Sequence, residues 1–305
     1  ELARVVTELA RKLSADVESG RVVSLFSAKG GLGATTLAAN LAGALAEEGK
    51  RVVLVDLDLQ LGDVLVFLDA ASRYTIADVL HNLKRLDRDL LHSSLARHAS
   101  GVYLLAQSDH LEDADKVTAA QIPTLLKFLA RHFDYVVCDG LRGFDELALA
   151  TLDASDKVLL VVTQDVPSIK NGQRCLDVMR RLGYGDDKLH LMVNRHQKSE
   201  IDLQSIADNL GVPVMASVAN DYQTAVKAIN RGLLLRDVAP RAKVVEDITR
   251  TARIFSGATA VRERKGFLRG LFNRADDKRP AATADKETKD ERSDGDEPER
   301  APEAV

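Results

Sequence analysis

A glycine-rich stretch near the start of the chain has the composition of a phosphate-binding loop. It reads AKGGLGATT over residues 28–36, just after the apolar run RVVSLF and just before a segment of helical periodicity. Glycines allow a backbone to approach a phosphate with its amides turned inward, and the N-terminus of the following helix favours an anion. We therefore predict an anion-binding nest at Gly30, Gly31 and Gly33, with Leu32 in the same loop.

The loop lacks the lysine that usually grips the phosphates. Ala34 stands in its place, which removes a point charge normally set against the β- and γ-phosphates. Losing one charge-assisted contact costs on the order of 1.5–3 kcal/mol, which is roughly a tenfold to hundredfold loss of affinity. Backbone amides and Mg²⁺ would still hold a nucleotide, but phosphoryl transfer relies on positioned cations and would suffer more. We therefore expect nucleotide binding with slow or vestigial hydrolysis.

Two threonines and three aspartates could complete a nucleotide and metal site beside this loop. Thr35 stands where a hydroxyl would ligate Mg²⁺, and Thr36 would contact the α-phosphate side; the alternative is that both are local helix caps. Asp139 ends a buried apolar run, where an unpaired carboxylate is costly, and it is placed to hold Mg²⁺ through water. Asp56 and Asp58 end another strand on one face, because alternate residues of a strand share a face.

A dinucleotide-binding fold is an alternative interpretation of the glycine loop. It requires G-x-G-x-x-G, but threonine occupies the third glycine position here, and no acidic residue about 20 positions further on has a clear ribose-binding context. The spacing of Asp56 and Asp58 keeps this alternative open. A glycine-rich turn that binds nothing is the other alternative.

Apolar, β-branched runs alternate with longer segments of helical periodicity from about residue 21 onward. The runs include RVVLVDL, YVVCD, KVLLVVT and LHLMVN. Such alternation predicts an α/β fold, with a mostly parallel twisted sheet covered by helices on both faces. Continuous runs such as KVLLVV are expected to form central strands buried on both sides.

Composition excludes several classes of protein. With 305 residues, 45% hydrophobic residues and a formal charge of −4, the chain can bury a sizeable core. Its two cysteines, Cys138 and Cys175, have no metal-ligand spacing, and its seven histidines are scattered singly, so neither a zinc site nor a disulfide framework is supported. A reducing, cytoplasmic setting fits best, and no apolar run reaches the roughly 18 residues needed to span a bilayer.

Five stretches, in order, resemble the MinD/ParA superfamily of P-loop ATPases. KGGLGATT resembles the deviant Walker A loop, whose pattern is K-G-G-x-G-K-[ST]-[ST]. VVLVDLDLQLGDV resembles the strand that leads into switch I, and FDYVVCDGLRGFDE resembles the Walker B strand with switch II. VNR resembles the adenine-contacting segment, and SVANDYQTAVKAINRGLLL resembles the late I-P-x-D segment. The resemblance covers residues 22–235 and implies the P-loop NTPase fold.

The resemblance implies ATP or ADP with Mg²⁺ as cofactors and assigns roles to individual residues. Lys29 would reach across a nucleotide-sandwich homodimer to the partner's phosphates, Asp58 would orient the attacking water, and Asp56 would support the metal shell. Two prolines of the family are absent, with Leu141 and Ala219 in their places. The implied nucleotide contacts are Lys29, Gly30, Gly31, Leu32, Gly33, Ala34, Thr35, Thr36, Asn194, Arg195 and Asn220.

Within the superfamily, the alanine-bearing loop and the phrases DLDLQLGDV, RGFDE and DVPSIKN are most similar to the CpaE/TadZ branch. That branch is associated with assembly and polar placement of Tad-type pili. We expect a weak ATPase that acts as a dimeric switch on pilus, secretion or polar-landmark proteins, at a cell pole or the inner membrane. The alternatives are a MinD-like membrane-associated positioning ATPase and a ParA-like partition ATPase that coats DNA. A net charge of −4 does not favour DNA.

The chain divides into four predicted regions. Because it opens with Glu1 rather than methionine, we expect a longer N-terminal region, with residues 1–20 as a helical linker. Residues 21–258 would form the ATPase domain, residues 259–274 a basic amphipathic segment and residues 275–305 a disordered acidic tail.

The basic amphipathic segment carries one apolar helix face bordered by arginines and a lysine. The face consists of Phe267, Leu268, Leu271 and Phe272. This composition favours contact with a membrane surface, and a dimer would present two copies. Docking on a protein partner and packing on the domain itself are the alternatives.

Overall fold

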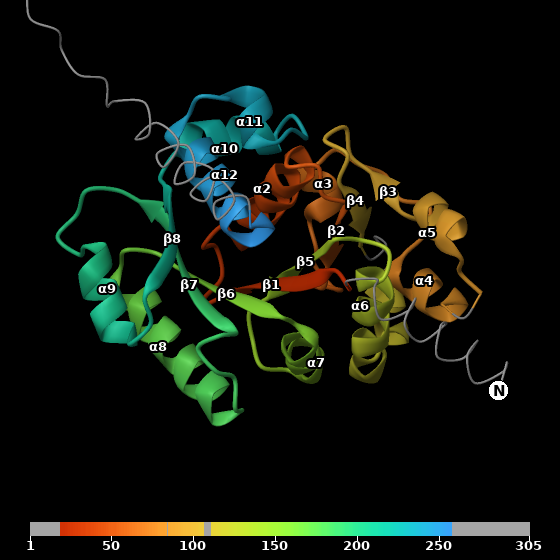
Figure 1. The fold of residues 1–305 in the computed structure, drawn as a ribbon, viewed down its shortest axis with the longest axis horizontal. Coiled ribbons are helices and arrows are strands. Elements are labelled where there is room, and N and C mark those ends of the chain that lie inside the picture. Colours follow the sequence, from red (N-terminus) through yellow and green to blue (C-terminus); the bar gives the residue numbers. More distant parts are fainter. Residues whose placement is uncertain (1–18, 84, 107–110, 258–305) are drawn as a thin grey trace, which may run out of the picture. The chain divides into compact units, whose positions relative to one another are not determined.

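The computed structural model describes residues 19–83, 85–106 and 111–257. Within them, eight strands form one sheet with the order β3-β4-β2-β5-β1-β6-β7-β8 (Figure 1). Neighbouring strands are parallel except for the antiparallel pair β3–β4 at one edge. The strands are β1 (Arg21–Ser27), β2 (Val52–Asp56), β3 (Ala96–Arg97), β4 (Tyr103–Leu105), β5 (Tyr135–Leu141), β6 (Lys157–Val162), β7 (Leu189–His196) and β8 (Val214–Ala219).

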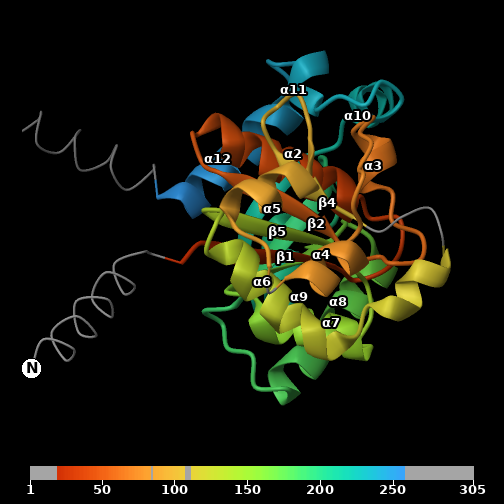
Figure 2. The same cartoon turned by 90° about the vertical axis from the view of Figure 1, so that its right-hand side faces the viewer.

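Helices cover both faces of this sheet (Figures 1 and 2). Helices α2 and α12 pack against each other on one face, and α6, α7 and α8 lie on the other. The helices are α2 (Ala34–Glu47), α3 (Val64–Phe67), α4 (Ile76–Asn82), α5 (Arg88–Ser94), α6 (Ile122–Ala130), α7 (Glu146–Ala154), α8 (Val166–Arg181), α9 (Leu203–Leu210), α10 (Tyr222–Ile229), α11 (Leu235–Val238) and α12 (Lys243–Ser256), with 3-10 turns at Leu111–Lys116 and Ala119–Gln121. The predicted fold class, a mostly parallel sheet between two helical layers, is confirmed.

The central strands are buried on both sides, as their continuous apolar runs predict. The five residues of β6 from Val158 to Val162 have no exposed surface, and β1 is buried from Val22 to Ser27. Removal of such runs from water supplies the main driving force for folding. At the far end of β5 the hydroxyl of Tyr135 donates to the Phe255 carbonyl at 2.6 Å, which ties the end of α12 to the sheet.

The ends of the chain fall largely outside the description. Most of the expected linker (1–20), the basic amphipathic segment (259–274) and the acidic tail (275–305) lie outside the described residues. The last described helix, α12, ends at Ser256 with Gly257 as its left-handed cap. Among the described helices, none has the length and apolar character that a bilayer crossing requires.

Candidate functional site

The predicted phosphate loop joins β1 to α2 at the carboxyl ends of the central strands. In it, Gly31 and Gly33 have φ angles of 77° and 83°, in the left-handed region that favours glycine. A Cβ atom at Gly33 would also lie 2.8 Å from Nδ2 of Asn194, so that side chain would have to shift to admit a larger residue. Gly33 is the N-cap of α2 and provides no side-chain cap, which leaves the first helical amides available to an anion.

A cavity of about 340 Å³, here called the loop cleft, opens between this loop and the loops that follow β2 and β5. It brings together most of the predicted site residues. They are Gly30, Gly31, Leu32, Gly33, Ala34, Thr35, Thr36, Asp56, Asp58, Asp139 and Arg195. Lys29, Asn194 and Asn220 are not part of its lining in the described chain.

Thr35 and Asp139 form a corner of the cleft that suits a divalent cation. Asp139 is 2% exposed, and, against the larger effect of burial, the nearby Thr35 side chain lowers the pKa of its carboxyl. Its Oδ1 atom is buried without a hydrogen-bond partner among the described residues, and burial raises the pKa of this carboxyl. Because buried polar atoms are normally paired, this atom calls for a ligand. A carboxylate and a hydroxyl are hard oxygen donors of the kind that Mg²⁺ takes alongside phosphates and waters.

Asp56 holds the loop after β2 in place. Its Oδ1 accepts from the amide of Asp58 and its Oδ2 from the amide of Val64, each at 3.1 Å. Gly62 packs so closely on this carboxylate that a Cβ there would lie 2.4 Å from Oδ2. Burial, and next the negative charge of Asp139, raise the pKa of Asp56 to about 7. Its contacts are therefore with the backbone, and its contribution to a metal shell stays a prediction.

Asp58 is paired with a residue that sequence reasoning did not single out. Its carboxylate forms an ion pair with the guanidinium of Arg142, and it also accepts from the amide of Leu61 at 3.2 Å. Arg142 lies in the loop after β5 and lines the cleft. In the sequence it is marked only by its position three residues after Asp139 and as the first residue of RGFDE.

Lys29 lies at the start of the loop, and its side chain pairs with an aspartate of its own chain. Its Nζ atom is 3.0 Å from Oδ1 of Asp165, and its side chain is 36% exposed. Asp165 also caps α8 by accepting from the amide of Ser168 at 2.9 Å. The sequence marked this aspartate only as part of DVPSIKN, and its pairing with Lys29 spans 136 positions. A contact from Lys29 to a second copy stays a prediction.

The three predicted adenine-side residues have different surroundings. Asn194 donates from Nδ2 to the Leu32 carbonyl at 2.7 Å, and Arg195 donates from Nη2 to the Gly31 carbonyl at 2.8 Å. Both therefore hold the loop from the end of β7. Asn220, after β8, donates its amide to the His196 carbonyl at 3.0 Å and lies outside the cleft lining.

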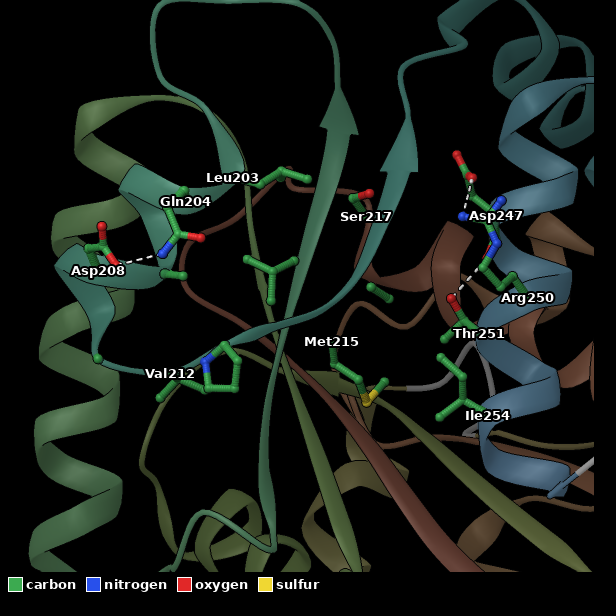
Figure 3. A pocket seen from close by; sticks show the side chains of 15 residues that line it. Leu203, Gln204, Asp208, Val212, Met215, Ser217, Asp247, Arg250, Thr251 and Ile254 are labelled. Carbon is green, nitrogen blue, oxygen red and sulfur yellow. Dashed lines mark hydrogen bonds and ion pairs between the residues drawn. The ribbon is translucent and has the colours of Figure 1, made fainter. Parts of the chain in front are cut away.

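A second cavity, here called the edge groove, lies beside the edge strand β8 between α9 and α12 (Figure 3). Its volume is about 780 Å³, more than that of the loop cleft. Several of its polar side chains are paired with each other or with backbone: Gln204 donates to Asp208 at 2.8 Å, and Asp247 accepts from the Ala219 amide at 3.1 Å. It contains no glycine loop and no predicted site residue.

The β1–loop–α2 unit, with a carboxylate at the end of β5, defines the class of protein as a P-loop NTPase. Residues 20–183 match a family model described as "AAA domain". The septum site-determining protein MinD of Bacillus subtilis is 30% identical over 225 residues, covering 70% of this chain and 81% of that protein.

Two solved structures share the fold. The ParA family ATPase from Chlorobium tepidum superposes with a TM-score of 0.72 at 24% identity, covering 77% of this chain and 98% of that one. MinD from Pyrococcus horikoshii, solved with Mg-ADP, gives 0.69 at 23% identity, covering 79% and 98%. The chain belongs to the MinD/ParA superfamily.

Proposed function

We propose that this protein is an ATP-binding switch that dimerises when ATP and Mg²⁺ are bound and hydrolyses ATP slowly. The observation that carries the proposal is the unpartnered Oδ1 of Asp139 beside Thr35, in a cleft whose other wall is a glycine loop with uncapped amides. When bound, Mg²⁺ would neutralise charge on the terminal phosphates. Thr35 and Asp139 would hold it, the loop amides would hold the phosphates, and Asp58 would orient water.

Slow hydrolysis follows from the residue at the start of α2. Ala34 lines the cleft but has no charge to place against a phosphate. Ground-state binding has several other contributors, whereas a transition state that develops charge depends strongly on fixed cations. We expect a long-lived bound state, which suits a protein whose output is binding rather than product.

Exposed apolar side chains that follow the carboxyl ends of strands support a second copy as one partner. Leu61, Val66, Val166 and Tyr222 are between 56% and 72% exposed. Leu61 and Val66 follow β2, Val166 follows β6 and Tyr222 follows β8, so all four come after carboxyl ends of strands. Large apolar groups exposed near one site are typical of an interaction face. In the proposed dimer Lys29 would leave Asp165 for the partner's phosphates.

For the output we favour a CpaE/TadZ-like role in placing or assembling a pilus or secretion machine at a cell pole. The alanine-bearing loop and the phrase DVPSIKN support this branch. The similarity to MinD proteins favours a second candidate, a MinD-like positioning ATPase at the inner membrane surface. The MinD-like role requires Phe267, Leu268, Leu271 and Phe272 to bind lipid, whereas the CpaE/TadZ-like role does not depend on it. Co-sedimentation with anionic vesicles, lost in Phe267→Glu with Phe272→Glu, would favour the second.

Calorimetry of ATP and ADP with Mg²⁺, paired with sedimentation of the same samples, tests the switch itself. We expect ATP to bind and to shift the chain from monomer to dimer, and Lys29→Ala to keep binding while losing the shift. Lys227→Ala is a matched control because Lys227 is an exposed lysine on α10, away from the phosphate loop in the sequence and outside the cleft lining. A wild-type chain that binds neither nucleotide contradicts the proposal.

A further inference from the structure

The loop cleft is acidic for a site that must receive a polyanion. Its described lining includes four aspartates: Asp56, Asp58, Asp63 and Asp139. The cations that it includes are Arg142 and Arg195. Since Ala34 contributes no charge, the counter-charge that the cleft lining of one chain can offer a triphosphate comes from one or both of these arginines, in addition to Mg²⁺.

Arg195 is already engaged in holding the glycine loop. Its guanidinium donates to the Gly31 carbonyl at 2.8 Å, and its backbone is in the left-handed region with a φ of 54°. Its neighbour Asn194 donates to the next carbonyl of the loop, that of Leu32. Both contacts fix the loop from the β7 side, so re-aiming Arg195 would release the loop that binds the phosphates.

Arg142 has no such structural task. Its side chain is 54% exposed, and the contact that the structure shows for its guanidinium is the ion pair with Asp58. Ion pairs with an exposed partner are weak because water screens them. The guanidinium can therefore exchange Asp58 for a stronger anion at little cost.

The backbone places Arg142 on the metal side of the cleft. Gly140 has a φ of 90° and packs against the loop after β2, where a Cβ on it would lie 2.3 Å from the Asp58 amide. The turn that carries Arg142 therefore packs against Asp58 at Gly140, the residue that follows Asp139. Thr35 and Asp139 would hold Mg²⁺ at this end of the cleft, and the ion would neutralise charge on the terminal phosphates there.

We propose that Arg142 is the phosphate-binding cation of this cleft and takes the place of the lysine that Ala34 lacks. On ATP binding, its guanidinium leaves Asp58 and contacts the γ-phosphate, and the released Asp58 carboxylate becomes free to orient water. ADP has no γ-phosphate and leaves the Arg142–Asp58 pair intact. Arg142 thus makes the cleft selective for the triphosphate. This inference rests on the proposed function of the site as an ATP switch.

The test compares Mg-ATP and Mg-ADP affinities by calorimetry for the wild type, Arg142→Ala and Arg142→Lys. Arg142→Ala should weaken ATP binding by roughly tenfold to hundredfold and ADP binding by less than about threefold, because one charge-assisted contact is lost only with ATP. Arg142→Lys should retain part of the preference for ATP. Adding Ala34→Lys to Arg142→Ala should restore ATP affinity.

Arg250→Ala is the matched control, because Arg250 is an exposed arginine paired with an aspartate, Asp247, at the edge groove. It should leave both affinities unchanged, and thermal melting of each variant checks the fold. A wild type that binds ATP, with an Arg142→Ala variant that keeps the same ATP-to-ADP ratio, overturns the role of Arg142 alone. A wild type that binds neither nucleotide overturns the proposed function together with it.

Discussion

The edge groove has the larger volume of the two cavities, whereas the loop cleft has the unpaired polar groups. The edge groove is the larger, at about 780 Å³ against about 340 Å³. Its carboxylates have partners: Asp208 accepts from Gln204, and Asp247 accepts from the backbone of β8. In the loop cleft, Asp139 is buried with one oxygen unpaired, and the first amides of α2 have no side-chain cap. Unsatisfied polar groups, rather than volume, distinguish a site built for a ligand.

The largest effect is expected when the carboxylate with the unpaired oxygen, Asp139, loses its charge. Asp139→Asn should weaken Mg-ATP binding by about a hundredfold or more, because a buried charge-assisted contact to the metal is lost. The melting temperature should hold or rise, since the variant also removes a buried carboxylate. The equivalent change in the groove, Asp208→Asn, should alter neither property. Equal nucleotide affinity in the two variants, measured by calorimetry, would contradict the distinction.

Adding the missing charge should sharpen the comparison. Ala34→Lys should raise ATP affinity by roughly tenfold to hundredfold, and it should raise the steady-state hydrolysis rate by at least as much. The reason is that a fixed cation stabilises the transition state more than the ground state. A wild-type chain that already hydrolyses ATP as fast as the Ala34→Lys variant would contradict the proposal of slow hydrolysis.

The shape of the loop provides a smaller test. Gly33→Ala combines backbone strain with a clash against Asn194, and it should lower the free energy of unfolding by about 1–3 kcal/mol. It should also weaken ATP binding. Gly49 has a similar φ of 80°, but a Cβ there meets nothing within 4 Å. Gly49→Ala should therefore cost stability without changing ATP affinity. Urea unfolding and calorimetry on both variants separate strain from the loss of the loop.

The smallest effect is expected at the edge groove. Ile254 lines it and is 45% exposed. Ile254→Gln should change the free energy of unfolding by no more than about 0.5 kcal/mol, as for most surface substitutions. ATP affinity should stay the same within error. A marked loss of ATP binding would mean that the two cavities are coupled through α12 and the sheet.

The fold could be predicted in some detail because its signals are local. The run KVLLVV becomes β6, buried from Val158 to Val162, and AKGGLGATT becomes the turn after β1 and the start of α2. The cleft lining also follows, since parallel strands bring their carboxyl ends to one edge of a sheet. Asn220 shows the limit of this reasoning, because it directly follows a strand of the same sheet, β8, but lies outside the cleft lining.

The pairings within the site could not be predicted. Arg142 and Asp58 are separated by 84 positions, and Lys29 and Asp165 by 136. No periodicity or motif reports contacts over such distances, because these contacts depend on where the loops after the strands lie once the sheet has formed. The same holds for Asp56, whose two oxygens are taken by amides of the loop that follows it.

The sequence by itself determined that glycines, threonines and aspartates would follow buried strands, because hydrophobic periodicity and backbone freedom are properties of short segments. The tertiary structure alone decided which charges meet. It placed Arg142 against Asp58 and left Asp139 with an unpaired oxygen, since electrostatic pairing depends on distance and burial after the chain has folded.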